Sequence, residues 1–127
     1  MSAFGFAAVG VGAALGAWLR WILGIFFNPV LPQVPLGTLI ANLVGGYVIG
    51  VSVELLGRHA GLPPEIRLFV ITGFLGGLTT FSTYSAEAVA LLSRGQLGWF
   101  LVHLAGHLIG SLVLTVLGIY TVRALNW

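Results

Sequence analysis

Four long apolar stretches alternate with short polar or proline-rich segments along the chain. They cover about residues 4–27, 36–56, 65–92 and 97–122. At about 1.5 Å per residue, each is long enough to cross a hydrocarbon core of about 30 Å as an α-helix. The pattern predicts an all-α membrane protein in which residues 1–127 form a single domain of four transmembrane helices.

The third apolar stretch contains an unusual sequence at residues 73–85, GFLGGLTTFSTYS, with three glycines and six hydroxyl side chains. Irregular backbone in a membrane is tolerated only inside protein or beside a wet cavity. Half-helices of about 15 Å and about 20 Å on either side would place a break near residues 74–79 at the bilayer midplane. Two interpretations are open: a functional break that offers carbonyl groups to a cation and N–H groups to an anion, or a softened helix that kinks against a neighbour.

Two polar residues lie inside the first two apolar stretches. Arg20 is about 24 Å along the first helix, so its charge must extend to the far interface or face a polar cavity. Asn42 carries a carboxamide that needs partners in lipid. It either joins two helices by hydrogen bonds or presents a donor to a passing solute.

The third and fourth helices carry further polar side chains. Those of the fourth helix recur every four residues and form one polar line: His103, His107, Ser111 and Thr115. The two histidines have a spacing known from metal sites, but no third ligand is evident, and hydrogen bonding between helices is expected instead. Glu87 lies within two turns of the end of its helix, where solvation at the interface is a plainer role than proton transfer.

Composition excludes several classes of protein. The chain is 58% hydrophobic and 6% charged, with a mean hydropathy of +1.08. It has no cysteine, so disulfides, thiolate metal sites and cysteine nucleophiles are excluded. A net charge of +2 is too small and too scattered for a nucleic-acid surface. The first apolar stretch lacks the basic segment of a signal peptide and is expected to be retained as a helix.

The arginines bear on orientation. Four spans place Arg58, Arg67 and Arg123 on one side of the membrane, against Arg94 and an extended Arg20 on the other. So small a bias suggests that chains insert both ways and pair antiparallel. Such a dimer would bring two helix breaks together and enclose a cavity that four helices cannot easily enclose.

Three motifs together resemble the Fluc (CrcB) fluoride channels over essentially the whole chain. They are Gly16-x-x-x-Arg20, the sequence GTLIAN at residues 37–42, and GFLGGLTTFST at residues 73–83. The resemblance implies an antiparallel, dual-topology homodimer in the inner (plasma) membrane of a bacterium. It also implies passive export of fluoride through two pores, and no enzymatic activity.

The resemblance also implies site residues. A structural sodium ion at the dimer centre would be held by the backbone carbonyls of Gly76 and Thr79. Arg20 matches a vestibule arginine, and Tyr84 stands where the family has a second pore phenylalanine. The other implied members of the fluoride pathway are Asn42, Phe81, Ser82, Thr83 and Ser111. Neutral donors and aromatic edges suit fluoride, because they can replace its water of hydration without binding the anion so tightly that it cannot leave the pore.

Two other classes of protein remain as alternatives. A small multidrug transporter shares the four-helix, dual-topology design but uses a carboxylate in its first helix, where this chain has only Arg20. A non-transporting helper subunit would explain the glycines by helix packing alone, but not the clustered hydroxyls or Asn42.

Overall fold

The computed structural model describes residues 1–127, which form helices and no strands. Four helical segments are long and apolar enough to cross a membrane: Ala3–Val30, Leu36–Arg58, Pro64–Ser93 and Leu97–Leu125. The prediction of four membrane-spanning helices is therefore confirmed, and the chain is a multi-pass integral membrane protein.

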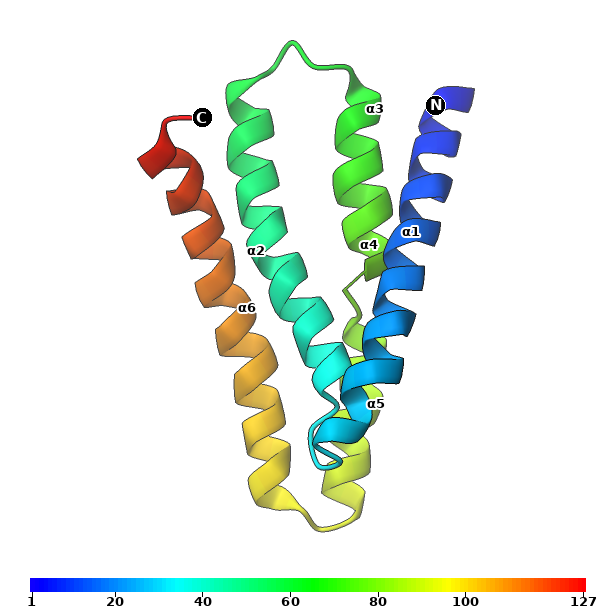
Figure 1. Ribbon diagram of the computed structural model, residues 1–127, viewed down its shortest axis with the longest axis vertical. Helices are drawn as coiled ribbons and strands as arrows, with labels where there is room; N and C mark the ends of the chain where they lie inside the picture. The colour runs from blue at the N-terminus through cyan, green and yellow to red at the C-terminus, as the bar shows by residue number, and fades with distance from the viewer.

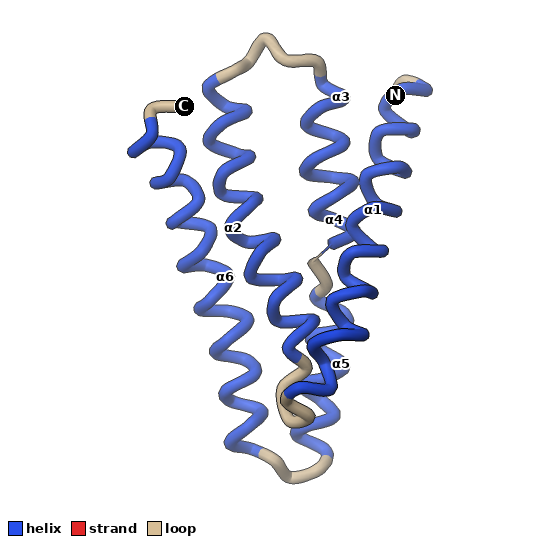
Figure 2. The backbone as a smooth tube through the Cα atoms, viewed as in Figure 1, coloured by secondary structure: helices blue, strands red, loops and turns tan.

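The helices form an open bundle that is wider at one end (Figure 1). α1 (Ala3–Phe27) packs beside the first half of the third span, and α2 (Leu36–Arg58) packs along α6 (Leu97–Leu125). A short turn, η1 (Asn28–Val30), follows α1. Both termini lie at the same end as the loop that follows α2, whereas the other two loops lie at the opposite end (Figure 2). The chain thus crosses the bundle four times in alternating directions.

The third span is assembled from four pieces. They are α3 (Pro64–Arg67), the π-helix η2 (Leu68–Leu75), α4 (Gly76–Leu78) and α5 (Phe81–Ser93). An α-helix was expected over the first half of this span, and the π-helical geometry differs from that expectation. Hydropathy cannot distinguish an α-helix from a π-helix, because both helices form the hydrogen bonds of their backbone groups internally.

Close backbone contact holds the helices together. A Cβ atom at Gly16 of α1 would overlap the carbonyl oxygen of Phe74, and one at Gly50 of α2 would overlap the carbonyl oxygen of Thr115. Without a hydrophobic driving force between helices in lipid, association depends on such close packing at small residues. These contacts set the positions of α1 against η2 and of α2 against α6.

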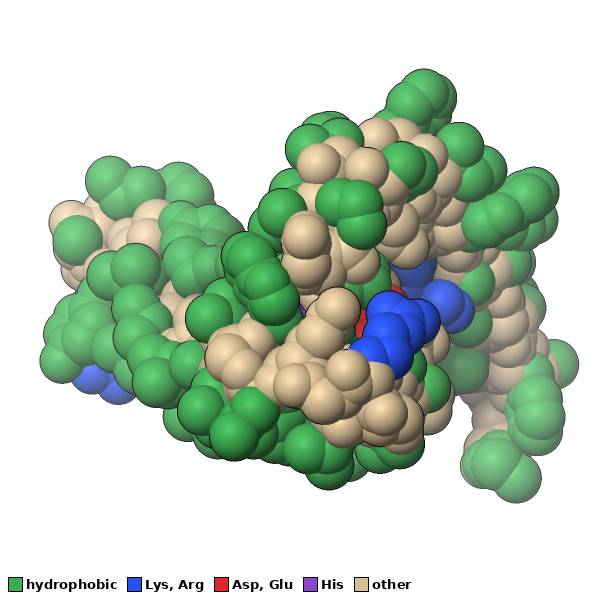
Figure 3. Space-filling view, turned by 90° about the horizontal axis from the view of Figure 1, so that it is seen from below, with side chains coloured by type: hydrophobic (Ala, Val, Ile, Leu, Met, Phe, Trp, Pro, Cys, Tyr) green, Lys and Arg blue, Asp and Glu red, His purple; other side chains and the backbone are tan.

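Few large side chains are buried within the single chain. A small core joins Ala41, Leu75 and Leu78, while most large apolar side chains point outward, including Trp21 and Leu108. Seen from the end where α5 turns into α6, hydrophobic side chains cover much of the outside, and basic side chains appear right of the centre and at the left edge (Figure 3). An outward apolar surface of this extent suits contact with lipid or another membrane-embedded chain.

Glu54 lies near the end of α2 and pairs with two arginines. Within the helix, its carboxylate lies 3.2 Å from the guanidinium of Arg58. In addition, Nε of Arg123 on α6 lies 3.0 Å from Oε1 of Glu54. The carboxylate therefore joins two helices, because the packing of α2 along α6 brings their ends together. α6 itself continues to Leu125, where Asn126 ends it in the left-handed conformation.

Candidate functional site

Thr79 and Thr80 separate α4 from α5 with extended backbone. Their φ and ψ angles are −122° and 122° for Thr79, and −130° and 115° for Thr80. Oγ1 of Thr80 caps α5 by accepting from the N–H of Thr83 at 3.1 Å. A threonine before a helix commonly satisfies an amide in this way, so the local sequence favours a new helix start here.

Asn42 of α2 holds this extended segment with its side chain. Its Oδ1 accepts from the N–H of Thr80 at 2.8 Å, and its Nδ2 donates to the carbonyl of Thr80 at 3.3 Å. The same Nδ2 lies 3.0 Å from Nδ1 of His107 on α6. Asn42 therefore connects three helical segments.

The network determines the tautomer of His107. The N–H of Thr80 can only donate, so the oxygen of the Asn42 amide must face it and the NH₂ group must face His107. Nδ1 of His107 then accepts, and the neutral ring carries its proton on Nε2. Nε2 is buried and has no hydrogen-bond partner. The ring therefore offers one unused donor.

Two carbonyl groups beside the extended residues lose their usual helical donors. In a continuous α-helix the N–H of Thr80 would donate to Gly76, and the N–H of Thr83 would donate to Thr79. These two N–H groups are instead directed to Asn42 Oδ1 and to Thr80 Oγ1. Gly76 and Thr79 are both exposed in the chain. Neither carbonyl oxygen therefore accepts the amide that it would accept in a continuous α-helix.

A cavity of about 590 Å³ lies between α2, α6 and the extended segment. Six of the nine site residues that the resemblance implies line it: Asn42, Gly76, Thr79, Phe81, Tyr84 and Ser111. Sequence reasoning did not assign His107 or Thr115 to a pathway, yet both line the cavity. Their spacing along the polar line of α6 was a usable signal, because both share the face that carries Ser111.

Aromatic rings form one wall of the site. The ring centroids of Phe81 and Tyr84 are 5.5 Å apart, and those of Tyr84 and His107 are 4.7 Å apart. Tyr84 also stacks on His103, with centroids 5.2 Å apart and planes at 21°. Phe81 is 80% exposed and faces away from the chain's own core. The wall thus continues to the outer surface.

Three of the residues singled out lie outside the cavity lining. Ser82 is exposed, with its Oγ 3.3 Å from Oγ1 of Thr80, and Thr83 is engaged through its backbone amide. Nε of Arg20 donates to the carbonyl of Gly77 at 3.1 Å. The arginine therefore contacts α4, directly beside the residues that precede the extended segment.

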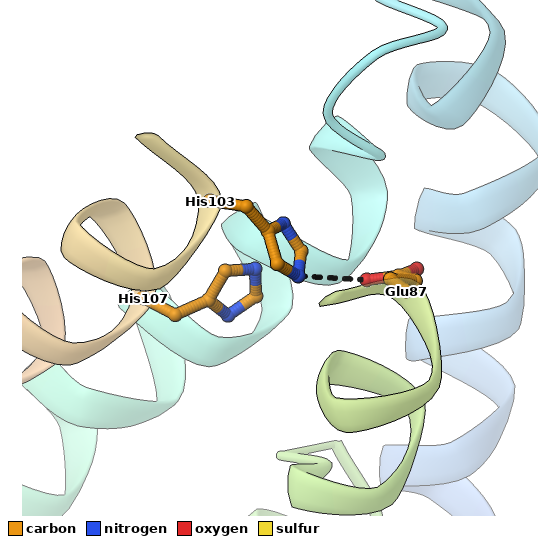
Figure 4. Close-up of side chains that lie close together, drawn as sticks. All are labelled: Glu87, His103 and His107. Carbon is orange, nitrogen blue, oxygen red and sulfur yellow. Dashed lines mark ion pairs between the residues drawn. The ribbon is translucent and has the colours of Figure 1, made fainter. Parts of the chain in front are cut away.

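Glu87 and the two histidines form a second polar group beside the cavity (Figure 4). Oε2 of Glu87 accepts from the hydroxyl of Thr38 at 2.7 Å, and Nε2 of His103 lies 3.2 Å from the carbonyl oxygen of Tyr84. No third ligand beside the histidines was evident from the sequence, and Glu87, which was expected to be solvated at the interface, is instead half-buried and bonded to Thr38. The pairing of α5 with α6, which the sequence does not reveal, places Oε1 of Glu87 3.7 Å from His103. The expected hydrogen bonding of the histidines to other helices is confirmed.

These features define a small, all-helical, multi-pass membrane protein with a cavity beside the extended residues Thr79 and Thr80. A family model described as CrcB-like protein, Camphor Resistance (CrcB), matches residues 7–119. The chain belongs to this family, and the resemblance drawn from the motifs is confirmed.

Curated relatives match over nearly their full lengths. A protein of Ralstonia pickettii is 63% identical over 126 residues, covering 99% of this chain and 100% of the relative. A protein of Nitrosospira multiformis is 60% identical over 123 residues, covering 97% of this chain and 96% of the relative. Both relatives are named fluoride-specific ion channel FluC, which is the name of a channel and not of an enzyme.

Proposed function

We propose that this protein is a fluoride channel that lets the anion leave the cytoplasm passively through the plasma membrane of a bacterium. One observation carries the proposal: a largely apolar cavity carries a few neutral hydrogen-bond donors and aromatic rings, with no fixed charge among its lining residues. Fluoride is strongly hydrated, so a pore must replace its water without binding it too tightly. Neutral donors meet both needs, and the names of the relatives point to the same ion.

The pathway donors include Asn42, Ser111 and His107. Both hydrogens of the Asn42 amide are already directed to acceptors, at 3.3 Å for Thr80 and 3.0 Å for His107. The longer bond to Thr80 is the one that yields when an anion arrives. His107 needs no such exchange, because its Nε2–H has no partner. The pathway therefore has one free donor, the Nε2–H of His107, and one donor, the amide of Asn42, that becomes free when its bond to Thr80 breaks.

Phe81 and Tyr84 contribute the positive edges of their rings, which weakly attract an anion. Ser82, Thr83 and Arg20 belong to the same pathway, although they do not line the cavity of the single chain. Ser82 and Phe81 are both exposed on the outer surface of α5. A neighbouring chain placed there would complete a pore to which both chains contribute.

The second chain is a copy of this one, inserted in the opposite orientation. Support comes from the exposed aromatic wall at Phe81, the nearly balanced arginines and the outward apolar surfaces. Each chain then acts as one four-helix domain, with its remaining apolar faces against lipid. Cysteine cross-linking between exposed positions of α5 tests the arrangement, and exclusively parallel pairs would count against it.

A structural sodium ion at the centre of this dimer fits the carbonyl groups of Gly76 and Thr79. Sodium is a hard cation that prefers oxygen ligands, and these two carbonyls have lost their usual helical donors to Asn42 and Thr80. Both residues are exposed and line the cavity. When bound, the ion would supply positive potential beside the pathway.

The decisive experiment is ion efflux from liposomes that contain the purified protein. Fluoride release is followed with a fluoride electrode and compared with chloride release from matched vesicles. Fast fluoride release with little chloride release is the expected result. No fluoride release from a well-folded dimer would reject the proposal and favour a helper subunit.

A further inference from the structure

Glu87, His103 and His107 converge from two helices on one point beside the cavity (Figure 4). One ligand atom from each residue can be chosen so that all three lie within 4.8 Å of one another. Tetrahedral zinc bonds place ligand atoms roughly 3.4 Å apart, which modest side-chain rotation would achieve here. The group has no role in the proposed passage of fluoride except through His107.

Each of the three side chains keeps one buried polar atom without a hydrogen-bond partner: Oε1 of Glu87, Nδ1 of His103 and Nε2 of His107. His103 is 0% exposed and His107 is 4% exposed. Buried polar atoms are usually paired, and leaving them unpaired inside a membrane is costly. His103 meets Glu87 through Nε2 and not through Nδ1, so the unpaired atoms that a ligand in this group would satisfy are Oε1 of Glu87 and Nε2 of His107.

We propose that Glu87, His103 and His107 bind a zinc ion. Two imidazole nitrogens and one carboxylate oxygen are a ligand set that zinc favours, and three protein ligands leave a fourth position open. Hard cations such as sodium and calcium prefer sites made of oxygen alone, so this site differs in kind from the carbonyl groups of Gly76 and Thr79. Because His107 lines the cavity, the open position and the route of entry both lie on the cavity side.

Zinc binding competes with two bonds of the metal-free protein. A metal ion that coordinates His107 weakens the hydrogen bond between Nδ1 of that histidine and Asn42. A metal ion that coordinates Nε2 of His103 displaces the carbonyl group of Tyr84 from that nitrogen. Both changes alter walls of the cavity. Zinc should therefore inhibit fluoride passage. This consequence rests on the proposed function, whereas the metal site itself does not.

Binding is measured on the purified full-length protein by calorimetry with zinc, and by visible absorption with cobalt as a spectroscopic substitute. We expect one ion per chain and the absorption of tetrahedral cobalt. Glu87→Gln removes the charged ligand but keeps an acceptor for Thr38, and His103→Gln removes one imidazole. Each should weaken zinc binding at least roughly tenfold, since even the loss of a supporting partner costs about that much. The matched control is His59→Gln, an exposed loop histidine, which should bind as the unaltered protein does.

The liposome assay supplies the second readout. Zinc should slow fluoride release by the unaltered protein and by His59→Gln, and Glu87→Gln should lose this sensitivity. No zinc binding by the folded protein would overturn the inference, as would equal binding by the control and the cluster variants. Size-exclusion chromatography shows whether each variant is folded. If His103→Gln does not fold, the comparison of zinc binding rests on Glu87→Gln. If no protein releases fluoride, the proposed function fails while calorimetry still decides the metal site.

Discussion

The substitution Asn42→Asp tests the central role of one carboxamide. Aspartate keeps the oxygen that accepts from the N–H of Thr80 but loses the NH₂ group, which lies 3.3 Å from the carbonyl of Thr80 and 3.0 Å from Nδ1 of His107. Two lost hydrogen bonds at about 1 kcal/mol each set the loss in stability at about 2 kcal/mol or more, because the carboxylate also faces two acceptors. Size-exclusion chromatography shows whether the variant is folded before fluoride release is measured.

The effect on fluoride should be larger than the effect on stability. A carboxylate about 4 Å from the passing anion raises its energy by about 4 kcal/mol at an effective dielectric constant of about 20. A barrier increase of about 4 kcal/mol slows passage roughly a thousandfold. Fluoride release from liposomes, measured with an electrode, checks this value.

A matched variant separates charge in the cavity from charge elsewhere. Asn28→Asp makes the same chemical change at a residue whose Oδ1 accepts from the amides of Gly37 and Thr38 at the start of α2. An acidic side chain suits a helix N-terminus, so fluoride release should stay near that of the unaltered protein. If folded Asn42→Asp releases fluoride within about tenfold of the unaltered protein, the reasoning from charge is refuted.

Three further substitutions test other parts of the structure. Phe81→Ile keeps bulk but removes the aromatic edge, so fluoride release should fall sharply while chromatography shows the same assembly as for the unaltered protein. Gly16→Ala places a methyl group against a backbone carbonyl and should lower the thermal midpoint, whereas Gly10→Ala on the same helix meets nothing within 4 Å and should not. Thr80→Val removes the cap of α5 and should cost about 1 kcal/mol in denaturant unfolding, which Thr80→Ser should largely restore.

Local patterns in the sequence were sufficient to locate the spans and several residues that line the cavity. Hydropathy and length identify four crossings, because each helix in lipid must satisfy its backbone within itself. The GFLGGLTTFST motif and the Asn42 motif direct attention to residues that line one cavity. The polar line on α6 could be found from spacing alone, since helical periodicity is a property of the segment itself.

Tertiary structure decided which of these polar faces meet. Close packing at Gly16 and Gly50 sets the helices against one another, and that packing depends on contacts between residues far apart in the chain. It brings Asn42 to His107 and Glu87 to His103, pairings that no local pattern encodes. The tautomer of His107 and the diverted amides of Thr80 and Thr83 follow from those pairings. Sequence therefore determined the crossings and their polar faces, whereas the alignment of the helices created the site.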